Sequence, residues 1–254
     1  MIYIKKGPPP QRVASEISRI KRDPAWRHLP KFPPTNLLQK SGYVGTLRAY
    51  FNQLPKADIR QASWEEQRGL CAYCMRQLPD PNPMTNADSI RIEHWFPLSK
   101  ARDTAIDYKN MLAVCDGIYS ENHKRCACCD RKKSGEQITI DPRNQAMMDW
   151  ICYESTGRLY CDFPNHVRED DRNSITKDIN DRLCLNSPDS DLISGRKAAY
   201  RSCMEHLDLL RRKNQCTVSN VHKLVSALET QTQYPEYVGV MLFCYKRWLK
   251  KHSR

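Results

Sequence analysis

The stretch Ile90-Arg91-Ile92-Glu93-His94-Trp95-Phe96-Pro97 decides the fold prediction for this chain. It predicts a short strand that ends near Pro97, with an acid and a histidine side by side at its end. A carboxylate there can bind a hard divalent metal, and a histidine can accept a proton from water. A histidine taken alone is more often an ordinary packed residue, so the neighbouring motifs must decide between the two interpretations.

The second motif is Cys71-Ala72-Tyr73-Cys74, whose two thiols lie on one predicted turn. Further cysteines follow, and this grouping favours a four-cysteine zinc site over a redox pair. Cys115 is the expected third ligand. The fourth ligand is left open among Cys126, Cys128 and Cys129, with His123 as a minor alternative. The scattered cysteines are interpreted as small core residues: Cys184, Cys203, Cys216 and Cys244.

The chain has 254 residues and a net charge of +12, from 41 Lys and Arg against 29 Asp and Glu. A protein this basic commonly has a polyanionic partner, of which nucleic acid is the most frequent. The first residues contain no apolar segment long enough for a signal peptide, and no stretch is long and apolar enough for a membrane span. We therefore expect a cytoplasmic protein without membrane contact, in which clustered cysteines bind metal rather than form disulfides.

Three regions follow from the pattern of apolar and turn residues. Residues 1–62 form a Pro-rich arm with helices, where Val13, Ile17 and Ile20 share one helical face and residues 43–54 form another helix. Residues 63–145 contain the site, and Ser63-Trp64-Glu65-Glu66 predicts a capping box that starts a short helix. Residues 146–254 form a hairpin over 148–163 and three C-terminal helices.

The order of these motifs resembles the HNH endonucleases. The resemblance implies an α+β fold with a ββα-metal core, a four-cysteine zinc knuckle and mostly helical flanking parts. It implies that Glu93 binds a catalytic Mg²⁺ or Mn²⁺, that His94 is the general base, and that Asn110 orients His94 through a hydrogen bond. It also selects Cys115 and Cys129 as the last zinc pair, with Cys126 as the alternative. Asp130 stands where the family usually has His or Asn, so Asp130 or His123 is the second ligand of the catalytic metal.

More of the chain is similar to the PtuB-type HNH proteins of Septu anti-phage systems and some retrons. This likeness covers the N-terminal start, the Ile-Glu-His-Trp-Phe-Pro box, and Leu183-Cys184-Leu185-Asn186 with Arg196. It implies a PtuA-like ABC/SMC-type ATPase as a partner. In retron settings it also implies a reverse transcriptase and its RNA–DNA product, the msDNA. The N-terminal arm and the C-terminal helices are then expected to bind the ATPase, unless their apolar faces close the protein's own core.

Basic residues surround the predicted site, and five of the ten residues from Lys124 to Lys133 are Lys or Arg. Such a cluster beside a metal would contact phosphates. The expected nucleic-acid-binding residues are Arg91, Lys124, Arg125, Arg131, Lys132 and Lys133. The expected function is a metal-dependent endonuclease that acts on DNA or on RNA such as tRNA. A zinc-ribbon binding module without catalysis is the alternative, and it would not need Glu93, His94 and Asn110 together.

Overall fold

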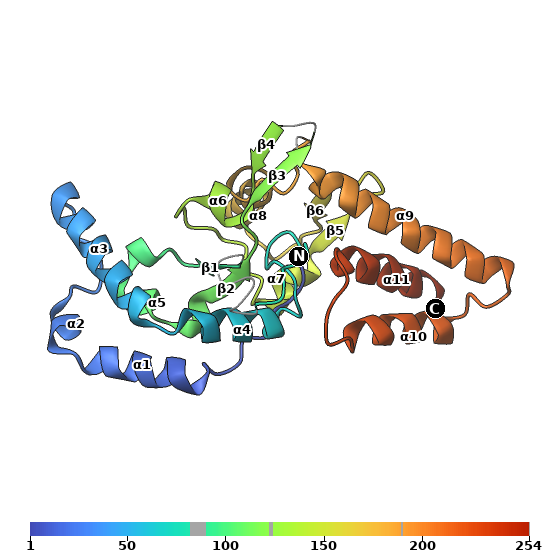
Figure 1. The fold of residues 1–254 in the computed structure, drawn as a ribbon. Helices are drawn as coiled ribbons and strands as arrows, with labels where there is room; N and C mark the ends of the chain where they lie inside the picture. Colours follow the sequence, from blue (N-terminus) through green and yellow to red (C-terminus); the bar gives the residue numbers. More distant parts are fainter. Residues whose placement is uncertain (82–89, 122–123, 189, 254) are drawn as a thin grey trace.

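A computed structural model describes residues 1–81, 90–121, 124–188 and 190–253, with the backbone alone for 118–121 and 124–126. The chain combines helices with three two-stranded antiparallel sheets (Figure 1), so the predicted α+β class is confirmed. The sheets pair β1 with β2, β3 with β4, and β5 with β6. Their strands are β1 (Arg91–His94), β2 (Met111–Val114), β3 (Ile118–Glu121), β4 (Lys124–Ala127), β5 (Ile151–Tyr153) and β6 (Leu159–Cys161).

Four helices precede the central hairpin and form a core of their own. They are α1 (Gln11–Arg22), α2 (Pro24–His28), α3 (Leu37–Gln53) and α4 (Lys56–Glu66). Val13 and Ile20 of α1 are fully buried there, together with Trp26 and with Leu47 of α3. The predicted helices around Ile17 and over residues 43–54 are thus confirmed, the second with a longer N-terminal end.

The predicted capping box at Ser63 is wrong. The motif lies at the end of α4, which begins at Lys56 directly after Pro55. Burial of Ile59 keeps the helix continuous through the motif, and Ser63 faces the interior rather than capping a new helix. A capping preference of about 1 kcal/mol is smaller than the stabilisation from burying an isoleucine. The chain then turns at Arg68 and Gly69, both with positive φ, before it reaches Cys71.

The central hairpin lies between two separate cores. In the β1–β2 register Glu93 is opposite Leu112 and His94 is opposite Met111. Neighbouring side chains of a strand point to opposite faces. Accordingly Met111 joins the core of the N-terminal helices, whereas Leu112 joins the larger core that contains the cysteine cluster. Short helices surround this hairpin: η1 (Leu98–Lys100), α5 (Arg102–Ala105), η2 (Tyr108–Asn110) and α6 (Cys129–Lys133).

The C-terminal region contains the hairpin and the helices that the sequence predicts. After α7 (Gln145–Asp149) and the β5–β6 hairpin come α8 (Glu169–Lys177), η3 (Asp178–Arg182), α9 (Asp191–Arg212), α10 (Val218–Glu229) and α11 (Val238–His252). Arg196 of α9 is buried and donates to the carbonyls of Gly157 and Leu185, each at 2.7 Å. Asn186 pairs with the backbone of Leu159 on the same hairpin. Asn186 and Arg196 thus anchor the hairpin to the α9 region.

Both ends of the described chain are built into the fold. Met1 and Ile4 are buried in the main core, and the Ile4 amide donates to the Pro142 carbonyl at 2.8 Å. Helix α11 buries Val240, Trp248 and five further residues. The apolar faces of the arm and of the C-terminal helices therefore close the protein's own core. In the described part of the chain, no helix combines the length and apolar character that crossing a membrane requires.

The packing of α1 predicts that this helix stabilises the whole N-terminal unit. Ile20→Ala should lower the free energy of unfolding by about 2–5 kcal/mol, because it leaves a cavity at a fully buried position. Ile17→Ala, at a partly buried position of the same helix, is the control and should cost clearly less. Urea unfolding measures both. Equal and small effects would mean that α1 is a detachable arm.

Candidate functional site

Four buried cysteines meet at one point: Cys71, Cys74, Cys115 and Cys129. Their sulfur atoms all lie within 4.8 Å of one another, with 3.9 Å from Cys71 to Cys129 and 3.8 Å from Cys74 to Cys115. Ligands at about 2.3 Å around a tetrahedral zinc would be about 3.8 Å apart, so the spacing fits such an ion. These distances exclude disulfides, whose sulfurs lie about 2.05 Å apart. The cluster can hold a metal ion such as zinc.

Three segments contribute these thiols. Cys71 and Cys74 lie on a tight turn, in which the Met75 amide donates to the Cys71 carbonyl at 3.1 Å. Cys115 directly follows β2, and Cys129 is the first residue of α6. Cys128 is also buried but lies outside the cluster of four, and the side chain of Cys126 lies outside the described residues. The predicted choice of Cys129 as the fourth candidate ligand thus agrees with the geometry.

The thiols strongly influence one another's protonation. Burial raises the pKa of Cys71 and of Cys129 well above the usual value. Hydrogen bonds from neighbouring thiols, first from Cys128 and then from the other three cysteines of the cluster, lower the pKa of Cys115, which is the preferred thiolate of the group. A bound cation would instead favour the thiolate at every position, since a coordinating thiol is deprotonated. The donor set therefore suits a soft or borderline metal.

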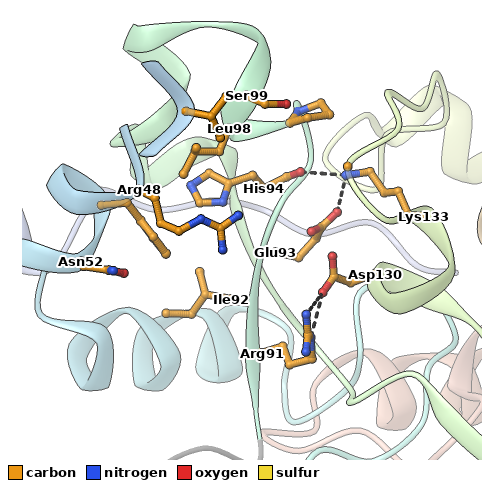
Figure 2. Close-up of a pocket in the computed structure, with 14 residues that line it drawn as sticks. Arg48, Asn52, Arg91, Ile92, Glu93, His94, Leu98, Ser99, Asp130 and Lys133 are labelled. Carbon is orange, nitrogen blue, oxygen red and sulfur yellow. Dashed lines mark hydrogen bonds and ion pairs between the residues drawn. The ribbon is translucent and has the colours of Figure 1, made fainter. Parts of the chain in front are cut away.

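A separate cavity of about 230 Å³ lies beside β1 (Figure 2). Helix α3, β1, the η1 region and α6 supply its walls. The residues that line it are Val44, Arg48, Phe51, Asn52, Arg91, Ile92, Glu93, His94, Pro97, Leu98, Ser99, Asp130, Lys133 and Gly135. The predicted pair Glu93 and His94 and the predicted ligand Asp130 are therefore in one place.

On one side of the cavity two carboxyl groups and two cations form a compact network. Glu93 Oε1 accepts from Lys133 Nζ at 2.5 Å and from the Tyr73 hydroxyl at 3.2 Å. Asp130 accepts from Arg91 Nε at 2.8 Å. Burial and the nearby Asp130 outweigh Lys133 and raise the pKa of Glu93 to about 8. Glu93 thus retains its proton near neutral pH, and a divalent cation bound to these carboxyl groups would displace it. Their oxygens are ligands of the kind that Mg²⁺ and Mn²⁺ prefer.

His94 lies on the other side of the strand. Its Nε2 is 3.0 Å from the Ala105 carbonyl, and its ring packs edge-on against Phe51 with centroids 4.6 Å apart. Because a carbonyl oxygen only accepts, Nε2 must donate, and Nδ1 therefore has the free lone pair. Burial lowers the pKa of His94 to about 4. The imidazole is therefore neutral at neutral pH and able to accept a proton.

Asn110 positions His94 indirectly, which differs from the expected direct bond. Its Nδ2 donates to the carbonyls of Phe96 and Thr104 at 2.8 and 3.0 Å, and its Oδ1 accepts from the Phe96 amide at 2.8 Å. It thereby joins the loop after β1 to the segment that contains Ala105. Since the Ala105 carbonyl accepts from His94, Asn110 fixes the residue that orients the imidazole.

The predicted basic cluster does not face the cavity as one surface. Arg91 and Lys133 are bonded to carboxyl groups, and Lys133 also donates to the His94 carbonyl at 2.9 Å. Arg131 donates to the Asp116 carbonyl, and Lys132 is exposed. The side chains of Lys124 and Arg125 lie outside the described residues, as does His123.

Sequence reasoning missed the contribution of α3 to this cavity. Arg48, Phe51 and Asn52 line it from a helix that was assigned to the N-terminal region. A signal was present, because Arg48 and Asn52 are one helical turn apart and would share a face. What was missing was the position of that face relative to β1. Tyr73, between the first two cysteines, was also missed as a partner of Glu93.

Comparison with known proteins adds no assignment. No protein-family model matches the chain, and no curated protein is significantly similar to it.

The cysteine geometry makes a specific prediction about metal content. Cys129→Ser should lose most of the zinc that the four thiols would hold and strongly destabilise the fold, because a metal at this point would join three segments of the core. Cys128→Ser is the matched control, and it should retain zinc because its thiol contacts Cys115 without being one of the four mutually close sulfurs. Zinc is measured by elemental analysis of purified protein. Equal zinc in both variants, or less than half an equivalent in the wild type, contradicts the assignment.

Proposed function

We propose that this protein is a metal-dependent endonuclease of the HNH type that hydrolyses phosphodiester bonds in nucleic acid. The observation that supports this most is the placement of His94, Glu93 and Asp130 around one cavity. Hydrolysis of a phosphodiester needs a proton acceptor for water and compensation of charge on the phosphate. Glu93 and Asp130 are the residues that would hold Mg²⁺ or Mn²⁺, which would supply that compensation.

In this proposal His94 accepts the proton of the attacking water at Nδ1. The neutral imidazole and the bond from Nε2 to Ala105 support this role, since they leave Nδ1 as the acceptor. Asn110 holds helix α5, which contains Ala105, and Phe51 packs edge-on against the ring. The chain's own residues thus orient the base before any substrate binds.

The proposed zinc in the four-cysteine cluster has a structural role. It would connect the end of β2 to the start of α6, on which Asp130 and Lys133 lie. Four thiolate ligands leave no open position for a substrate, which is typical of structural zinc. Chemistry is therefore assigned to the β1 cavity and not to the cysteine cluster.

The substrate is proposed to be DNA, with RNA such as tRNA as the second possibility. The net charge of +12 supports a polyanionic ligand. A histidine base and a divalent metal act on the phosphate, which both nucleic acids contain. The alternative is a zinc-containing module that binds nucleic acid or a protein without cleavage. In such a module the neutral His94 in the cavity would have no catalytic role.

On the resemblance to PtuB-type proteins alone, we also propose a role in anti-phage defence with a PtuA-like ATPase, and in retron settings with a reverse transcriptase and its msDNA. The buried apolar residues of the N-terminal helices pack inside the protein, so they cannot bind the ATPase. Exposed residues of the same region can. Leu37 and Leu38, the first two residues of α3, remain 80% and 86% exposed. Exposed apolar side chains grouped in this way are typical of a protein contact.

The partner proposal predicts that Leu37→Asp together with Leu38→Asp abolishes co-purification with a co-expressed ATPase of this class. The change removes apolar contact area and adds charge at positions that are already in solvent, so the fold should persist. Lys250→Glu on α11 is the control and should leave the complex intact. A complex that survives the double substitution contradicts this surface.

The catalytic proposal predicts that His94→Ala abolishes cleavage while zinc content and folding persist. Loss of a general base typically reduces the rate by about 10²–10⁴-fold. Plasmid DNA, single-stranded DNA and RNA are incubated with each variant and Mg²⁺ or Mn²⁺, with and without the partner. His222→Ala, at an exposed position of α10, is the control and should cut as the wild type does. Undiminished cutting by nuclease-free His94→Ala protein rejects the HNH mechanism.

A further inference from the structure

The α3 wall of the β1 cavity has its own chemistry. Phe51 of this helix packs on His94, and Arg48 and Asn52 lie on the same side of α3 (Figure 2). Arg48 and Asn52 are exposed to solvent and are four residues apart, which places them one above the other on the helix. In Figure 2 the Arg48 guanidinium lies beside the His94 imidazole. The N-terminal core therefore presents a cation next to the proposed base.

The cations on the opposite wall are already engaged. Arg91 is bonded to Asp130 at 2.8 Å, and Lys133 to Glu93 at 2.5 Å. Each of these two cations therefore contacts one of the two carboxyl groups. Among the described residues that line the cavity, Arg48 is the cation that has no hydrogen bond or ion pair with another described residue. Its donors face solvent at the cavity and are available to a ligand.

We infer that Arg48 binds a non-bridging oxygen of the scissile phosphate, and that Asn52 donates to the same or the adjoining phosphate. This inference rests on the proposed nuclease function and extends it to a substrate-binding residue from the N-terminal unit. A guanidinium offers a planar pair of N–H donors that matches two phosphate oxygens, so it fixes orientation as well as charge. Its position beside His94 would hold the phosphorus close to the water that His94 deprotonates.

The placement also assigns a role to the N-terminal helices. Glu93 accepts from Tyr73 of the cysteine-containing core, and Asp130 directly follows Cys129 of that core. Arg48 instead lies on α3, whose Leu47 and Tyr50 belong to the other core. A phosphate bound between them would contact both cores at once. Substrate binding then depends on how the two cores are held together, and residues 37–53 are part of the active site rather than an accessory arm.

The test compares Arg48→Ala, Arg48→Lys and Asn52→Ala with Lys40→Ala, which removes an exposed cation of the same helix outside the cavity. We expect Arg48→Ala to lower kcat/KM by about 10²-fold or more, as loss of a charge-stabilising donor does. Arg48→Lys should recover part of this loss, because it restores the charge but not the paired donors. Asn52→Ala should have a smaller effect, and Lys40→Ala should act as the wild type.

Binding gives a second readout that a purely structural role would not change. In the His94→Ala background, an uncut duplex oligonucleotide is titrated with and without the Arg48→Ala change at several salt concentrations. Loss of one phosphate contact should weaken binding and reduce the slope of log K against log salt by about 1. Urea unfolding of Arg48→Ala should match the wild type, since the side chain is exposed.

The outcomes separate this inference from the function it rests on. If the wild type cuts, His94→Ala does not, and Arg48→Ala cuts at the wild-type rate, Arg48 is not a phosphate ligand and the nuclease assignment stands. If Arg48→Ala and Lys40→Ala lower kcat/KM and the salt slope equally, the effect comes from the loss of any surface cation, and the inference is also rejected. If the wild type cuts no DNA or RNA, both the function and this inference are rejected.

Discussion

The four-cysteine cluster is the constraint on which the rest of the site depends. Cys115 follows β2 directly, and Cys129 begins α6, so a metal bound to both would fix the helix against the hairpin. Asp130 and Lys133 lie on that helix, within one turn of Cys129. Their contacts with Arg91 and Glu93 on β1 therefore require the geometry of the cluster. Without that connection, a five-residue helix has too few contacts of its own to hold the half-buried Asp130 and the buried Lys133 in place.

The pleat of β1 imposes the second constraint. Adjacent positions of a strand point to opposite faces, and Glu93 and His94 consequently have different surroundings. Glu93 meets Tyr73 and Lys133, whereas His94 meets Phe51 and the Ala105 carbonyl. These surroundings shift the two pKa values apart, with Glu93 raised to about 8 and His94 lowered to about 4. Burial on the two sides of one strand thus keeps Glu93 protonated and His94 neutral.

Several features were predictable because they depend on local sequence. Val13, Ile17 and Ile20 repeat with the period of a helix, and α1 is present. The hairpin predicted over residues 148–163 is present as the β5–β6 pair. The capping box at Ser63 failed because a local preference was outweighed by the burial of Ile59 on the same helix. Asn110 lies next to the site, as predicted. Its hydrogen bonds go to the backbone of Phe96 and Thr104, however, and the types of residue in the sequence do not predict which backbone groups a side chain will reach.

The sequence by itself determined which residues have the required chemistry: the Glu93 and His94 pair, the acidic Asp130, and enough clustered cysteines for one metal site. Residue type and spacing along the chain suffice for these, because each depends on a few neighbouring positions. Only the tertiary structure decided that Arg91 pairs with Asp130, that Lys133 donates to Glu93, and that Arg48 faces the cavity. Those outcomes depend on the packing of α3 and α6 on either side of β1. That packing follows from burying apolar faces that are far apart in the chain, and no local pattern encodes it.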